Sequence, residues 1–178
     1  MTVPKLTIFV CGPKMAGKTA IANVLADVSG SLSTEYHPTQ AVRILEFESK
    51  VAGEKFPVAI ELWDCSGDPN FWSHVSATSS YATSVLLVQS KKGQEKDLET
   101  IYESTFSFMS SEKIHIFAHG GEISSRPKYS VGALQKAAIS YTSMDDQDSI
   151  RTAFKDLVNS TYKAYVAQKE DEEGSLLG

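Results

Sequence analysis

Short runs of apolar residues alternate along the chain with stretches in which apolar residues recur every three or four positions. The short runs predict β-strands at residues 5–11, 41–49, 58–63, 83–88, 113–119 and 137–143. The longer period predicts helices at residues 21–28, 94–109 and 150–165, with weaker helical patterns inside 65–80 and 120–136. Asp148 or Ser149 is the expected cap of the last helix.

The order of these elements indicates the fold class. Strands that alternate with helices favour an α/β fold with a mostly parallel six-stranded sheet and helices on both faces. The second and third strands are joined by the short turn VAGEKFP, so we expect them to form an antiparallel hairpin at one edge. We expect one domain over residues 1–167, followed by an acidic, disordered tail over residues 168–178.

Composition and charge narrow the range of functions. The 178 residues are 42% hydrophobic and 22% charged, which is typical of one globular domain, and the formal net charge of −5 disfavours nucleic acid as a partner. Cys11 and Cys65 do not form a C-x-x-C pair, which favours a reducing intracellular compartment. We expect no direct lipid anchor, because Thr2 stands where myristoylation needs glycine and the final SLLG has no cysteine to prenylate.

The stretch CGPKMAGKTA at residues 11–20 contains the spacing G-x-x-x-x-G-K-T. The residues in this spacing are Gly12, Gly17, Lys18 and Thr19. A phosphate-binding loop needs backbone N–H groups and a helix N-terminus aimed at the anion, a lysine for the terminal phosphates and a hydroxyl for Mg²⁺. The alternative is a pair of ordinary turn glycines. The motif follows a predicted strand and precedes a predicted helix, which favours phosphate binding.

Two further segments contain the residue types that accompany such a loop. LWDCSGD, at residues 62–68, places Asp64 at the end of a predicted strand, where a carboxylate can hold Mg²⁺ through water. Gly67 follows with a backbone N–H suited to a γ-phosphate. YHPT, at residues 36–39, lies in the loop after the first predicted helix. Each of these residues alone is also an ordinary turn residue, but the three segments in this order favour a nucleotide site.

GPKMAGKT, YHPT and WDCSGD resemble the phosphate loop, switch I and switch II of Ras/Rab-type small GTPases over about residues 5–167. More narrowly, EYHPTQAVRILEFE and ELWDCSGD resemble the intraflagellar transport Rab-like family. The resemblance implies a small-GTPase G-domain that binds GTP or GDP with Mg²⁺. It also implies that Lys18 binds the β- and γ-phosphates and that Gly67 senses the γ-phosphate.

Further roles follow from the same resemblance. Mg²⁺ would be held by Thr19, Thr39 and Asp64. The full nucleotide-binding set that the resemblance implies is Gly12, Lys14, Met15, Ala16, Gly17, Lys18, Thr19, Ala20, Thr39, Gly67, His119, Glu122, Ser143 and Met144.

Three residues depart from the pattern of an efficient GTPase. Asp68 stands where active relatives carry a water-orienting glutamine, and an ionised aspartate is shorter, negatively charged and unable to donate a hydrogen bond. Lys14 and Met15 add bulk where active relatives have small residues. We expect Lys14 to point into solvent, with a charge near the phosphates as the alternative. The sequence therefore predicts slow or absent intrinsic hydrolysis and no efficient catalytic residue.

The segment that would recognise the base also differs from the family pattern. Small GTPases carry N-K-x-D after the fifth strand, whereas this chain has HGGE, from His119 to Glu122. The Glu122 carboxylate is able to replace the guanine-binding aspartate, and a plain surface loop is the alternative. In YTSMDD, Ser143 matches the family's T-S-A-K loop but Met144 does not. Guanine preference is therefore expected mainly from the resemblance.

Protein partners are expected rather than small-molecule substrates. Phe71 and Trp72 lie in the predicted switch II segment, either as a partner-binding surface or packed on a neighbouring helix, with at least one ring expected to be buried. The resemblance implies assembly on coiled-coil subunits of the intraflagellar transport B complex, in the cytoplasm and at the cilium or flagellum and its base. We expect the isolated chain to be monomeric. The alternatives are a conventional switch GTPase stimulated by a partner and a P-loop nucleotide kinase.

Overall fold

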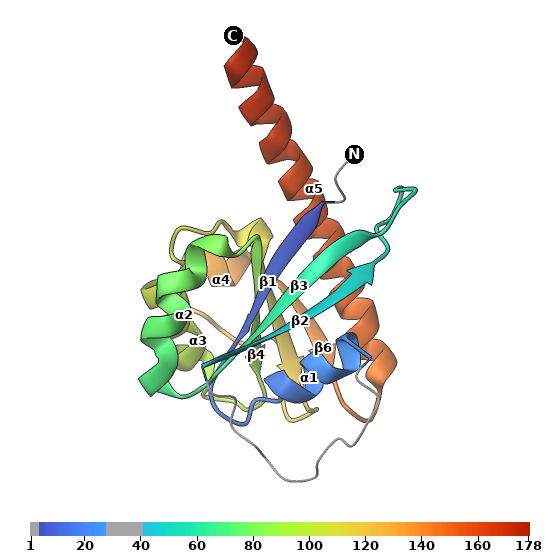
Figure 1. Ribbon diagram of the computed structural model, residues 1–178. Helices are drawn as coiled ribbons and strands as arrows, with labels where there is room; N and C mark the ends of the chain where they lie inside the picture. Colours follow the sequence, from blue (N-terminus) through green and yellow to red (C-terminus); the bar gives the residue numbers. More distant parts are fainter. Residues whose placement is uncertain (1–3, 28–40) are drawn as a thin grey trace.

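The computed structural model describes residues 4–27 and 41–178, and these residues contain a six-stranded sheet (Figure 1). The strands are β1 (Lys5–Cys11), β2 (Val42–Ser49), β3 (Val58–Cys65), β4 (Ser84–Gln89), β5 (Ile114–His119) and β6 (Ala138–Thr142). Their spatial order is β2-β3-β1-β4-β5-β6, with β2 antiparallel to β3 and the other neighbouring pairs parallel. The predicted α/β fold with one antiparallel edge strand is confirmed.

Helices cover both faces of the sheet. The described helices are α1 (Lys18–Leu25), α2 (Trp72–Thr78), α3 (Glu95–Ile101), α4 (Gly132–Lys136) and α5 (Gln147–Leu177). Buried side chains of α1 and α5 share one hydrophobic cluster with β1 and β3. Buried side chains of α2, α3 and α4 belong to a second cluster, which also contains Phe9 of β1. Phe9 stacks on Trp63 with ring centroids 4.7 Å apart.

The burial pattern explains which strands lie in the middle. Every residue of β4 and β5 is buried, as is β1 from Leu6 onward, because helices cover both faces of these strands. Strand β3 instead alternates between buried and half-buried positions up to Asp64, and β2 alternates between half-buried and exposed positions from Arg43 onward. The antiparallel register places Leu45 opposite Leu62 and Arg43 opposite Asp64. The carboxyl ends of the parallel strands meet at the edge of the sheet where the phosphate-loop motif begins.

The last helix differs from its prediction at both ends. Asp146, rather than Asp148 or Ser149, caps α5, because its side chain accepts a hydrogen bond from the Ser149 backbone N–H. Buried positions recur from Ile150 to Thr161 with helical spacing. Residues 168–177 continue the helix, which corrects the disordered tail expected from their acidity. These turns are exposed and extend past the sheet (Figure 1).

The helix predicted at residues 94–109 is shorter and irregular. α3 ends at Ile101, and Tyr102–Phe106 form a π-helical turn. Ser104 Oγ donates a hydrogen bond to the Thr100 carbonyl, which is an interaction that competes with regular helical pairing. The hydroxyl of Tyr102 donates to the Met109 carbonyl and closes the following turn. The apolar period continues past Ile101, but the regular α-helical hydrogen bonds do not.

Removal of residues 168–178 is predicted to leave the domain folded. No residue of α5 beyond Thr161 is buried, so we expect the free energy of unfolding to change by less than about 0.5 kcal/mol. Leu157→Ala removes a fully buried side chain from the same helix, and should cost about 2–5 kcal/mol. Urea denaturation of the two variants measures both values. A truncated chain as unstable as the Leu157→Ala variant would show that the last turns belong to the folded domain.

Candidate functional site

The phosphate-loop motif connects β1 to α1, and Lys18 is the first residue of the helix. The Lys18 side chain is buried, and its ammonium donates hydrogen bonds to the carbonyls of Gly12 at 2.9 Å and Pro13 at 2.7 Å. Burial lowers the pKa of Lys18, while the nearby Cys11 thiol and Asp64 carboxylate act in the opposite direction. The loop therefore folds around a cation.

Gly17 caps α1 in a left-handed conformation, with φ of 99°. A Cβ there would lie 2.7 Å from Cδ2 of His119, so a larger residue would clash as well as strain the backbone. His119 is buried at the end of β5, and its Nδ1 lies 2.9 Å from Thr142 Oγ1 at the end of β6. His119 thus connects the phosphate loop to the two strands from which the predicted base-binding loops begin.

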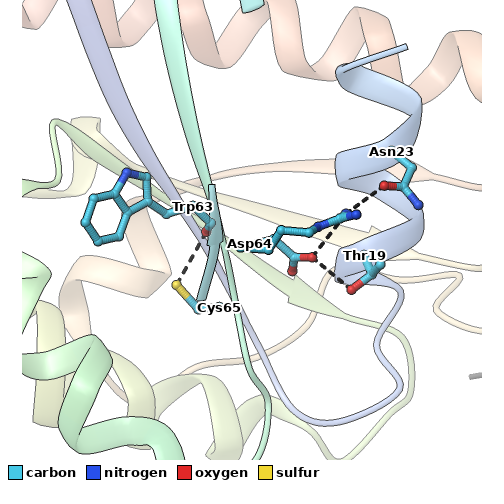
Figure 2. A network of polar contacts seen from close by, with 6 residues as sticks. Thr19, Asn23, Trp63, Asp64 and Cys65 are labelled. Carbon is cyan, nitrogen blue, oxygen red and sulfur yellow. Dashed lines mark hydrogen bonds and ion pairs between the residues drawn. The ribbon is translucent and has the colours of Figure 1, made fainter. Parts of the chain in front are cut away.

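Thr19 and Asp64 meet beside the loop. The Thr19 hydroxyl donates a hydrogen bond to Asp64 Oδ2 at 2.9 Å (Figure 2). Donation of its hydrogen directs the lone pairs of Thr19 Oγ1 elsewhere, and oxygen ligands are those that Mg²⁺ prefers. The side chain of Asp64 lies on the opposite side of β3 from Trp63 and Cys65 (Figure 2). The two predicted magnesium residues that the structure describes therefore fit such an ion.

Two residues that the sequence motifs do not indicate, Arg43 and Asn23, also belong to this site. Arg43 of β2 places Nη2 3.5 Å from Asp64 Oδ2 and donates a hydrogen bond to Asn23 Oδ1 at 2.6 Å. Arg43 lies on the same side of β2 as Leu45 and Phe47, which pack against the core. The signal in the sequence was a charged residue, Arg43, in the row of β2 that otherwise carries the core-facing Leu45 and Phe47.

Gly67, Lys14 and Asp68 bring the predicted switch II segment against the phosphate loop. A Cβ on Gly67 would lie 2.6 Å from the backbone nitrogen of Lys14 and 2.8 Å from Lys18 Nζ. The segment therefore approaches the loop closely enough to require glycine. The sequence predicts that Lys14 points into solvent. Its side chain is exposed, but its ammonium also lies 3.4 Å from Asp68 Oδ2. A hydrogen bond from the Asn70 backbone and the nearby Lys14 lower the pKa of Asp68. Asp68 is therefore ionised near neutral pH.

The remaining predicted nucleotide-binding residues are more dispersed. Within the phosphate loop and α1, Met15 is 70% exposed at φ of 62°, Ala16 is buried and Ala20 is half-buried. Glu122 is exposed beyond two glycines with positive φ. The backbone N–H of Ser143 donates to Ser149 Oγ, and Met144 packs against the first hydrophobic cluster. Thr39 lies outside the described residues.

Neither aromatic residue of the predicted switch II segment is fully buried. Phe71 and Trp72 are both half-buried, and Trp72 packs against the second hydrophobic cluster. The expectation of a buried ring is therefore wrong.

Within residues 4–27 and 41–178 there is no cluster of three or more His, Cys, Asp or Glu side chains suited to a metal ion. The helices of these ranges include none with the length and hydropathy needed to cross a bilayer.

Stability is predicted to decrease in mild acid because of two histidines on β5. Burial lowers the pKa of His115 and of His119 below the ordinary value of 6.5. The unfolded chain therefore binds more protons than the folded chain below about pH 6.5. The free energy of unfolding keeps its full value above this pH and decreases as the pH falls below it. Urea denaturation across this range measures the effect.

His119→Asn removes one of these titrations and should flatten the pH dependence. His74→Asn, at an exposed histidine of α2, is the matched control and should retain the dependence of the unmodified chain. An identical pH dependence in all three proteins would contradict the role of His119.

The chain is similar over nearly its whole length to known proteins from several organisms. No protein-family model matches the chain. The chain is 30% identical over 188 residues to the intraflagellar transport protein 22 homolog of Danio rerio, covering 97% of this chain and 98% of that protein. It is 32% identical to the Homo sapiens homolog with the same coverage. It is 29% identical to intraflagellar transport protein 22 of Trypanosoma brucei, covering 93% of this chain and 90% of that protein.

Solved structures that match the fold contain the same protein as these sequence relatives. The crystal structure of T. brucei IFT22/74/81 in its GTP-bound form matches with a TM-score of 0.69 and 28% identity, covering 92% of this chain and 98% of that chain. The GDP-bound T. brucei IFT22 structure matches with a TM-score of 0.64 and 27% identity, covering 90% and 98%. None of these relatives is named as a kinase, so they give no support to the kinase alternative. The narrower of the two families that the sequence motifs resemble is therefore confirmed, and the chain belongs to the intraflagellar transport protein 22 family.

Proposed function

We propose that the chain binds GTP or GDP together with Mg²⁺ and works as a Rab-like subunit of intraflagellar transport, with slow intrinsic hydrolysis. The observation that carries the proposal is the meeting of Thr19 and Asp64 at 2.9 Å beside the buried Lys18 ammonium. This places a hydroxyl, a carboxylate and a lysine at the N-terminus of one helix, which is the set that a magnesium nucleotide needs. The T. brucei relative in GTP-bound and GDP-bound forms supports the choice of guanine nucleotides.

Individual residues then take defined roles in binding. Lys18 would exchange the carbonyls of Gly12 and Pro13 for phosphate oxygens, and the backbone of Gly67 would face the γ-phosphate. Thr19 and Asp64, with Thr39, would hold Mg²⁺, which when bound neutralises charge on the phosphate oxygens. The exposed carboxylate of Glu122 is the candidate group for the guanine edge, with His119 holding its loop to the phosphate loop.

Slow hydrolysis follows from the state of Asp68. Its carboxylate accepts a hydrogen bond from the Asn70 backbone and faces Lys14, so it is ionised and already engaged. An ionised carboxylate accepts hydrogen bonds only and repels an anionic phosphate, whereas a glutamine amide both donates and accepts. The site is therefore suited to hold a nucleotide rather than to turn it over rapidly.

A protein partner is supported by exposed apolar side chains on and beside β2 and β3. Ile44 of β2 pairs with Trp63 of β3 and is 48% exposed. Tyr81 is 67% exposed, and its ring lies 6.3 Å from that of Trp63. An exposed aliphatic residue on the sheet and an exposed tyrosine beside it provide apolar surface of the kind that protein interfaces bury. We propose that the chain, monomeric alone, assembles on coiled-coil subunits of the intraflagellar transport B complex, as supported by the T. brucei IFT22/74/81 structure.

The proposed location follows from the family. Proteins named for intraflagellar transport are associated with the cilium or flagellum. We propose that this chain occurs there, at the base of the organelle and in the cytoplasm that supplies it.

Nucleotide binding is tested by titrating the purified protein with fluorescent GDP, and by competition with GTP and ATP, in the presence of Mg²⁺. We expect GDP and GTP to bind and ATP to compete less well. Lys18→Ala should weaken binding by about tenfold or more, because a charge-assisted hydrogen bond to phosphate is lost. Lys113→Ala is the control and should bind normally. Lys113 precedes β5, at the end of that strand opposite His119 and the phosphate loop. Absence of binding by the unmodified protein would overturn the proposal.

Hydrolysis is tested by single-turnover measurement with GTP. Asp68→Gln restores a side chain that both donates and accepts, so we expect the rate to rise by about tenfold or more. Asp68→Asn removes the same charge but keeps the shorter reach, and should remain slow. If both variants hydrolyse GTP as fast as each other, charge alone limits the reaction. If the unmodified protein is already rapid, the holding role is wrong.

A further inference from the structure

The carboxylate of Asp64, proposed above as a magnesium ligand, has a cation of the protein itself beside it. Asp64 is completely buried at the end of β3. A carboxylate taken out of water is unfavourable unless opposite charge or hydrogen bonds compensate it. Thr19 supplies a hydrogen bond to Oδ2, and Arg43 Nη2 lies 3.5 Å from the same oxygen. One carboxylate oxygen therefore faces a hydroxyl and a positive charge at once.

The position of Arg43 is determined by the sheet. The antiparallel register places Arg43 directly opposite Asp64. The same guanidinium donates to Asn23 Oδ1 on α1 at 2.6 Å, so β2 and α1 hold it from two sides. Its neighbours on this side of the strand, Leu45 and Phe47, pack against the apolar core. A cation in this row therefore has one clear electrostatic counterpart, the buried carboxylate across the strand pair.

We propose that Arg43 is a built-in counter-cation of Asp64 that weakens the dependence of nucleotide binding on Mg²⁺. This inference rests on the proposed function of the site. When Mg²⁺ is absent, the guanidinium compensates the charge of Asp64 and keeps β2, β3 and α1 together. When Mg²⁺ binds, two cations share the field of one carboxylate and repel each other, so the metal gains less than it would beside an uncompensated aspartate. Arg43 acts through Asp64 and is a positioning residue.

The first experiment measures how strongly Mg²⁺ promotes binding of fluorescent GDP. The quantity compared is the ratio of affinities in excess Mg²⁺ and in EDTA. Arg43→Gln keeps a polar side chain without charge, and we expect the ratio to increase by about tenfold, the size of a typical coupling between two sites. Arg43→Lys keeps the charge and should retain the ratio of the unmodified protein. Asn23→Ala removes the contact to α1 but not the charge and should also retain it.

An unchanged ratio in Arg43→Gln, or an equal increase in Asn23→Ala, would overturn the proposal. The second experiment needs no nucleotide, so it separates failure of this inference from failure of the proposed function. The unfolding of Arg43→Gln, Asp64→Asn and the double variant is measured in urea with EDTA. We expect Arg43→Gln to destabilise the chain clearly when Asp64 is present, and much less in the Asp64→Asn background, where an uncharged amide faces residue 43. Equal losses in both backgrounds, including failure of both to fold, would show a purely structural role and overturn the proposal.

Discussion

The burial of one carboxylate, that of Asp64, constrains how the elements around the site fit together. The register places it beside Val10 of β1 and opposite Arg43 of β2, so it lies between the strand that leads into the phosphate loop and the edge strand. A buried charge needs compensation, and here the compensating groups come from different elements: Thr19 from α1 and Arg43 from β2. The carboxylate thus joins β2, β3 and α1 at the edge where the phosphate loop begins.

The stability of the domain comes mainly from elsewhere. The cluster that contains α5 includes buried aliphatic and aromatic side chains from Ile150 to Val158 of the helix, and the buried Thr161 hydroxyl donates to Ser84 Oγ beside it. The site, by contrast, consists of loops that approach closely, with Gly17 against His119 and Gly67 against Lys14. This separation allows the loops to carry polar and charged groups without weakening the core, because the rigid sheet beneath them keeps their ends in position.

The sequence predicts well what depends on local pattern. The buried strands read as continuous apolar runs, and the loop motif between β1 and α1 is visible from spacing alone, because both signals lie within a few residues. Groups that meet through the fold are different. Arg43 and Asp64 are adjacent only after β2 pairs with β3 in one register, and His119 reaches Gly17 only after β5 takes its place in the sheet. Local rules also misplace the end of α3, where Ser104 bonds to a backbone carbonyl, and the end of α5, where acidity alone does not prevent helix formation.

Two of the three departures from an active GTPase pattern, Lys14 and Asp68, are best understood as one change. Separately, each is unfavourable: a lysine adds bulk to the phosphate loop, and an aspartate adds negative charge where a glutamine would orient water. Together they form an ion pair across 3.4 Å, with the side chains 54% and 25% exposed. An exposed pair of this kind contributes little to stability, so its importance lies in geometry. It joins the start of the switch II segment to the phosphate loop through side chains that belong to the protein itself. Because Asp68 is held by this pair and by the Asn70 backbone, the position that would orient water in an active enzyme instead helps to hold the loop together.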